Sequence, residues 1–165
     1  MNNRSIAAPT SLSILLAVLC FFSPAIANEG SSETSYLLKA EGYTVKIRTR
    51  VEYPPMKDSK GSHSGAGFLI DSERGWIATN AHVSSRNPES VEVSFKGQSF
   101  FEAKLLFVDR YLDLAVLEVP REKMPAGAKK AQLRCDDWPE VGSKVGAYGH
   151  PLSLDFSVTT GIVSG

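Results

Sequence analysis

Cysteine is scarce in this sequence, where only Cys20 and Cys135 occur among 165 residues. Cys20 lies in an N-terminal segment that we expect to be removed, which leaves one cysteine in the mature chain. A single cysteine cannot form a disulfide within the chain, even in an oxidising compartment. A disulfide-stapled fold is therefore excluded. Because no pair of His or Cys residues has the spacing of metal ligands either, we expect no metal and no cofactor.

Excess charge of one sign is also lacking. The sequence has 18 Lys and Arg residues against 18 Asp and Glu residues, and loss of the N-terminal segment removes only Arg4. A protein that binds DNA or RNA needs basic surface to neutralise phosphates. The balance argues against a phosphate-binding surface of that kind, so we expect no nucleic-acid partner.

Long apolar runs are missing as well. The longest one, residues 12–22, is shorter than the ~20 residues that cross a bilayer comfortably. It follows the positively charged Arg4 and ends near a small-residue motif at residues 25–27, which is the pattern of an export signal. We expect a signal peptide of residues 1–27 that is cleaved before Asn28, a periplasmic or secreted protein, and no stable membrane insertion. A retained N-terminal anchor is the alternative.

The sequence does contain a period-two alternation of apolar and polar residues, the pattern of half-buried β-strands. In residues 43–51, one face carries four apolar or β-branched side chains: Val45, Ile47, Thr49 and Val51. The same period gives two further faces: Val91, Val93 and Phe95, then Ala103, Leu105 and Phe107. Shorter apolar runs are predicted to be strands buried on both faces, at residues 68–70, 76–79 and 114–119. No long stretch shows the helical period.

The alternation stops in residues 121–139, whose charged residues, prolines and glycine indicate a linker. It resumes at residues 144–148 and 158–163. Several short strands with turns between them are typical of an all-β barrel or sandwich. The 138 residues after the signal therefore divide into a lead, a first β-barrel, an inter-barrel linker and the start of a second, unfinished barrel, with bounds 28–41, 42–120, 121–139 and 140–165.

One histidine and one aspartate stand next to buried strands. His82 directly follows the strand predicted at residues 76–79, and Asp113 comes 31 residues later, immediately before an apolar strand. An unpaired carboxylate there would be costly if buried, so it requires a hydrogen-bond donor. If the barrel brings the two together, Asp113 accepts the Nδ1 proton of His82 and leaves Nε2 free as a base. Spacing alone leaves a structural histidine and a turn-capping aspartate open.

A resemblance to a known family bears on that choice. Residues 64–71 (SGAGFLID), 76–83 (WIATNAHV) and 113–117 (DLAVL) resemble the glycine-rich strand, the histidine segment and the aspartate segment of the HtrA (Deg) serine proteases. Residues 141–165 resemble the entry into that family's second barrel. Two positions depart from the pattern, namely Ala66, where the family often has Ser, and His150, where it often has Asn.

The resemblance implies a trypsin-like double β-barrel, with the first barrel complete and the second truncated. It also implies a serine endopeptidase with protein or peptide substrates and assembly into a homo-oligomer. Carried over position by position, it makes His82 the general base and Asp113 its orienting carboxylate.

The third member of the triad has no match in this sequence. The family nucleophile lies in a Gly-Asn-Ser-Gly-Gly type of segment, and no serine here has those neighbours. The backbone donors of the oxyanion hole come from the same loop. We therefore expect an N-terminal fragment that is inactive alone. The alternative is a naturally short protein that acts as a non-catalytic, protease-like binding module.

The other reactive or aromatic residues have simpler interpretations. His63 is expected in a solvated loop, and His150 before a proline is interpreted as a turn residue rather than a ligand. Cys135 is interpreted as a small packed side chain. Trp76 and Trp138 are expected to pack in the core and between the lobes.

Overall fold

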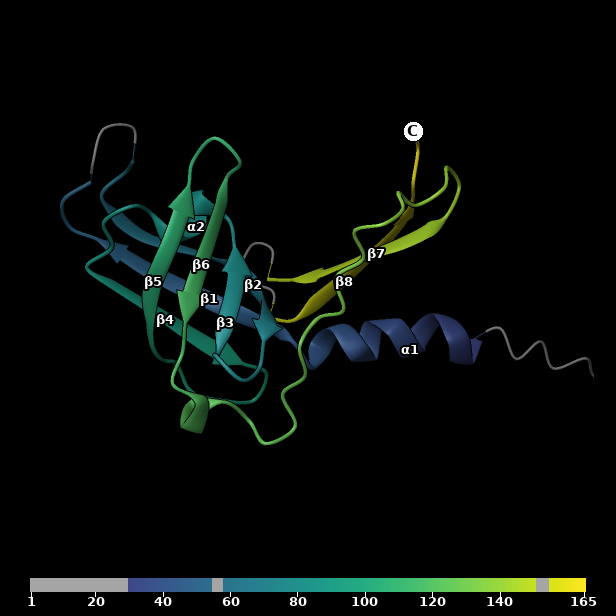
Figure 1. Cartoon of the computed structure of the whole chain (residues 1–165), viewed down its shortest axis with the longest axis horizontal. Coiled ribbons are helices and arrows are strands. Elements are labelled where there is room, and N and C mark those ends of the chain that lie inside the picture. Colours follow the sequence, from purple (N-terminus) through teal and green to yellow (C-terminus); the bar gives the residue numbers. More distant parts are fainter. Residues whose placement is uncertain (1–29, 55–57, 151–154) are drawn as a thin grey trace, which may run out of the picture.

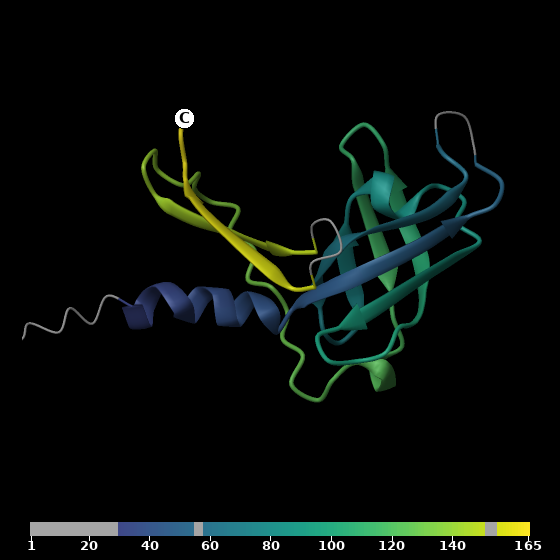
Figure 2. The same cartoon turned by 180° about the vertical axis from the view of Figure 1, so that it is seen from behind.

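The computed structural model describes residues 30–54, 58–150 and 155–165. A β-barrel lies at one side of the molecule, and a helix and a β-hairpin extend side by side from the other (Figures 1 and 2). The expected signal peptide, residues 1–27, lies outside the described residues. None of the described helices is long and apolar enough to span a membrane.

Six antiparallel strands close into a barrel in the order β1-β2-β3-β6-β5-β4. Their bounds are Thr44–Val51 (β1), Gly61–Asp71 (β2), Trp76–Thr79 (β3), Ser90–Phe95 (β4), Phe101–Asp109 (β5) and Leu114–Glu118 (β6). A one-turn helix, α2 (Ala81–Ser84), follows β3, and a 3-10 turn, η1 (Arg121–Lys123), follows β6. Closure gives every barrel strand two hydrogen-bonded neighbours, so the barrel has no free edge.

The alternation of β1 builds the barrel interior. Val45, Ile47, Thr49 and Val51 are all buried, as predicted. Val45 and Ile47 belong to one apolar cluster with side chains from the other strands, including Leu69, Ile77, Val91, Val93, Phe95 and Leu117. Burying a side chain of this size is worth about 1.5–3 kcal/mol, so packing alone can hold a barrel without disulfides.

A glycine makes the tight turn between β2 and β3. Gly75 has a φ of +70°, and a Cβ at this position would lie 2.2 Å from the carbonyl oxygen of Val119. Only glycine accepts both the left-handed backbone and the close approach. The Val119 N–H in turn donates to the Gly75 carbonyl, which ties the turn to the end of β6.

Three predicted strand faces differ from the structure. Phe68 and Leu114 are 37% and 39% exposed, so β2 and β6 alternate instead of being buried on both faces. Phe107 is 51% exposed because the register of β5 against β6 shifts between Leu105 and Phe107. Such a bulge inserts one residue and turns the following side chains to the other face.

A helix that the sequence did not predict, α1 (Gly30–Glu41), precedes β1. Its apolar residues all fall within positions 36–40 and do not recur along the polar first half of the helix, so no helical period is visible. The end of α1 is tied to other elements. Glu41 accepts hydrogen bonds from Lys96 Nζ at 2.7 Å and from Tyr148 Oη at 3.1 Å.

The segment expected to be a linker runs along the barrel. The N–H groups of Lys129 and Ala131 donate to the carbonyl oxygens of Gly42 and Leu69, and Ala131 is buried. The chain then forms a separate two-stranded sheet of β7 (Lys144–Gly149) and β8 (Ser157–Ile162). The all-β class and the closed first barrel are thus confirmed.

Candidate active site

His82 sits on α2, which presents it to solvent. Ala81, Val83 and Ser84 are buried against the barrel, whereas the His82 side chain is 71% exposed. The close fit of α2 requires a glycine opposite, because a Cβ on Gly65 would lie 2.6 Å from Cγ2 of Val83. The contact with Gly65 therefore holds α2 at Val83, the residue that follows His82.

Asp113 ends the turn between β5 and β6. The carboxylate of Asp109 caps this turn by accepting the N–H groups of Tyr111 and Leu112 at 2.8 and 3.1 Å. Asp113 itself has a φ of +50°, a left-handed conformation that Asp tolerates better than most residues. This conformation places its side chain over the start of α2.

The structure brings His82 and Asp113 together. Oδ1 of Asp113 accepts the backbone N–H of His82 at 3.0 Å, and Oδ2 lies 2.7 Å from Nδ1 of the His82 ring. An ionised carboxylate can only accept, so Nδ1 carries the proton. The neutral ring then has an unprotonated Nε2, which has no hydrogen-bond partner in the described part of the chain.

The environment favours the charged form of Asp113. Its pKa is lowered, mainly by the hydrogen bond from the His82 backbone N–H and further by the His82 ring and the side-chain amide of Asn80. Asn80 Nδ2 donates to both Oδ2 and the carbonyl oxygen of Asp113, at 3.1 and 3.2 Å. Asn80 is thus a site residue that the sequence did not single out, although it lies within the quoted histidine segment.

An open cleft of about 530 Å³ borders the pair, and its lining includes Asp58, His63, Ser85 and Arg110 as well as His82 and Asp113. Ser85 is the serine of this lining closest to His82 in sequence, but its hydroxyl donates to Asp58 Oδ2 at 2.7 Å. No serine hydroxyl in the described ranges is hydrogen-bonded to the His82 ring. The arrangement holds an imidazole by its Nδ1 against a carboxylate, and such a ring can accept a proton at Nε2.

In the described residues, neither of the other two histidines is hydrogen-bonded to this pair. His63 lies on β2 rather than in a loop, because β2 pairs with β1 as far as Gly61, and its Nε2 lies 3.0 Å from the Ser59 carbonyl oxygen. His150 follows β7 and packs edge-on against Phe156, with ring centroids 4.2 Å apart. The residues after it, 151–154, lie outside the described ranges. Within those ranges, no group of three His, Cys, Asp or Glu residues is placed to hold a metal ion.

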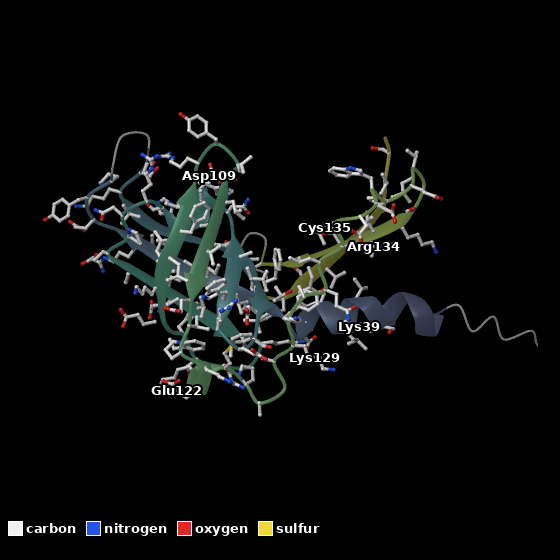
Figure 3. All side chains as sticks on the ribbon, in the orientation of Figure 1. Lys39, Asp109, Glu122, Lys129, Arg134 and Cys135 are labelled. Atoms are coloured by element: carbon white, nitrogen blue, oxygen red, sulfur yellow. The ribbon has the colours of Figure 1, made fainter. Side chains whose placement is uncertain are left out.

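The predictions for Cys135 and Trp138 were wrong. Cys135 is exposed, and Trp138 is 94% exposed. Figure 3 shows Cys135 beside Arg134, outside the barrel and on the side of the β7–β8 hairpin. Both residues belong to a segment without regular strands, where no neighbouring layer covers them.

Comparisons with known proteins place the chain in a family. A family described as a trypsin-like peptidase domain matches residues 65–165. The chain is 35% identical over 113 residues to a putative serine protease, HhoB, of Synechocystis, covering 68% of this chain and 26% of that protein. It is 37% identical over 116 residues to a probable periplasmic DegP-like serine endoprotease of Halomonas elongata, covering 67% and 23%. The chain therefore spans about a quarter of the length of these relatives.

Solved structures show the same fold. A serine endoprotease from Yersinia pestis matches with a TM-score of 0.65 and 26% identity, over 80% of this chain and 44% of that one. The HtrA-type protease AlgW with a tripeptide matches with a TM-score of 0.67 and 23% identity, over 80% and 39%. With a closed six-stranded barrel, a family match over most of the chain and HtrA-type relatives in both comparisons, the chain belongs to the trypsin-like peptidase family, in its HtrA (Deg) branch.

Proposed function

We propose that this chain supplies the general base, His82, and its orienting carboxylate, Asp113, to an exported serine endopeptidase. One observation carries the proposal. The 2.7 Å contact between His82 Nδ1 and Asp113 Oδ2 fixes the tautomer whose Nε2 can take a proton, and that nitrogen faces open solvent.

The mechanism is acyl transfer. His82 Nε2 takes the proton of a serine hydroxyl while the serine oxygen attacks the carbonyl carbon of a peptide bond. Asp113 stabilises the imidazolium that forms and stays ionised. The imidazolium then gives its proton to the leaving amine, and an acyl-enzyme ester remains. Water hydrolyses the ester by the same proton route through His82.

We further propose that residues 1–165 alone do not cleave peptides. No serine in them has the neighbours of the family nucleophile, and the oxyanion donors belong to that same loop. Removal of one triad member leaves ~10³ to 10⁴ over water because the oxyanion hole survives. That residual rate is lost when the hole is missing too. The attacking serine then comes from polypeptide outside these residues.

The family resemblance supports protein or peptide substrates and self-assembly of the chain. The charged N-terminus, apolar run and small-residue motif support export to a periplasmic or extracellular compartment.

The test uses the protein as its own cells produce it, called the native protein below. Hydrolysis of an unfolded protein substrate is measured for the wild type and for H82A. We expect H82A to lose nearly all activity, and His63→Ala, a change in the same cleft outside the pair, to retain it. Full activity in H82A would overturn the assignment. A wild-type native protein that binds unfolded substrates without cleaving them would favour the binding module instead.

A further inference from the structure

A second carboxylate, Asp58, lines the same cleft as the pair and is tied to neighbouring segments. Its side chain is only 13% exposed, although it lies in a polar loop. Oδ2 accepts the Ser85 hydroxyl at 2.7 Å and the Arg86 N–H at 3.4 Å, and Oδ1 lies 2.7 Å from Nη2 of Arg110. Aspartate side chains are rarely this well buried unless they are paired, as Asp58 is.

The partners of Asp58 come from the two segments that carry the catalytic pair. Ser85 is the C-cap residue of α2, and its N–H donates to the Ala81 carbonyl oxygen at 2.9 Å. Arg110 lies in the β5–β6 turn, three residues before Asp113. Figure 3 shows the neighbouring Asp109 at the end of β5, and Figure 1 shows α2 at that same end of the barrel. One side chain therefore joins the helix turn of His82 to the turn of Asp113.

Both segments need such a connection. A single helical turn is unstable alone, because nucleation costs more than one hydrogen bond returns. Ser85 and Asp113 also have left-handed backbones, with φ of +58° and +50°. Conformations of this kind cost on the order of 1–3 kcal/mol and persist only where surrounding contacts hold them. Asp58 supplies such a contact to Ser85 directly, and it pairs with Arg110 in the turn that Asp113 ends.

We propose that Asp58 is a positioning residue, which holds the α2 turn and the β5–β6 turn at the spacing that the His82–Asp113 hydrogen bond requires. This inference rests on the proposed function. The ion pair with Arg110 balances the charge of Asp58, so its effect on His82 is geometric rather than a direct field. The ring and the carboxylate meet at 2.7 Å only while both turns keep their places.

The main variant is Asp58→Asn in the native protein, with Asp71→Asn as a matched control. Asp71 also caps a turn and pairs with an arginine, Arg74, but at the opposite end of β3. A misplacement of about 1 Å can cost ~10²-fold in rate. We expect D58N to lower kcat by roughly 10- to 100-fold with KM within about two-fold, and D71N to leave both near wild type.

A second readout separates positioning from general destabilisation. The hydrogen-bonded Nδ1 proton of His82 and the ring ¹⁵N shifts are followed by NMR in the native protein. We expect D58N to broaden or remove this proton signal while D71N keeps it. An unchanged signal and unchanged kcat in D58N would overturn the proposal. If D58N does not fold, Ser85→Ala, which removes one of the contacts and keeps the ion pair, is measured instead with the same expected direction.

The last arm is a double-mutant cycle with Asp113→Asn. If Asp58 acts through the pair, D58N costs little more once Asp113 is replaced, whereas independent effects would multiply. Multiplicative losses would overturn the positioning role. Failure of the proposed function looks different, because H82A would then stay active while the NMR signal still responded to D58N.

Discussion

Both carboxylate oxygens of Asp113 contact His82: Oδ1 accepts the backbone N–H of His82, and Oδ2 accepts Nδ1–H of its ring. The same side chain therefore fixes where the helix turn begins and which way the ring faces. Two contacts to one residue also orient the carboxylate itself. A substitution at Asp113 should then alter the tautomer and the position of His82 together.

The first prediction concerns Asp113→Asn. An amide can donate to Nδ1, which favours the tautomer with the proton on Nε2 and removes the base. We expect kcat of the native protein to fall by about 10³ to 10⁴. Asp109→Asn is the control, because the asparagine keeps an oxygen to cap the same turn. Equal activity in D113N and D109N would contradict the role of Asp113.

The second prediction concerns the fit of α2. Gly65→Ala places a methyl group 2.6 Å from Cγ2 of Val83, whose β-branched side chain has few other rotamers. We expect a loss of about 1–3 kcal/mol in the free energy of unfolding and a lower kcat, because Val83 adjoins His82. Gly127→Ala has no atom within 4 Å of the new Cβ and should be neutral. Denaturant unfolding checks both, and a neutral G65A would show that α2 is free to shift.

The third prediction concerns the link between α1 and β7. Burial, followed by the hydrogen bond to Glu41 and the negative charge of that residue, raises the pKa of Tyr148 to about 12. The folded state thus resists ionisation, and its stability should fall between pH of about 10 and about 12 as unfolded tyrosine ionises first. Ultraviolet absorbance is titrated with pH for the wild type and for Tyr148→Phe. The difference between the two curves should show one tyrosine that ionises at a raised pH. We expect Y148F to lower the free energy of unfolding by about 1 kcal/mol. A difference curve in which Tyr148 ionises at the ordinary pKa of tyrosine would rule out the link.

The fourth prediction concerns acid. Burial acts to raise the pKa of Asp58, but hydrogen bonds from Ser85 and Arg86 and the charge of Arg110 together lower it, and the pKa of Asp113 is lowered mainly by the His82 N–H. A depressed folded-state pKa adds stability above the unfolded value of ~4, which is lost as pH falls through the folded value. The midpoint temperature of thermal unfolding should therefore fall below pH ~4. The profile of D58N/D113N should be flatter in that range, and identical slopes would contradict the shifts.

Much of the barrel could be predicted because period-two alternation reports directly on a buried strand face. Val45, Ile47, Val91 and Val93 all lie where that pattern puts them. Phe107 does not, because a bulge is a property of two paired strands and leaves no mark in one. Helix α1 was missed because its apolar residues are confined to positions 36–40, which is too short a stretch to show a helical period.

The site was harder to predict than the barrel. A separation of 31 residues says nothing about distance, and His82 meets Asp113 only through the α2 turn and a left-handed aspartate. Family resemblance, rather than periodicity, pointed to that pair. Asp58 gave no signal at all, because an aspartate in a polar, glycine-containing loop is ordinarily solvated and its partners come from distant parts of the chain.

The most direct test of the account is labelling of the native protein with a fluorophosphonate, which reacts readily with an activated serine. We predict rapid labelling of one serine outside residues 1–165, slowed at least ~10²-fold in H82A because Nε2 no longer takes the proton. Labelling at the same rate in H82A, or no labelling of the wild type, would contradict the claim that His82 is the base of a serine peptidase.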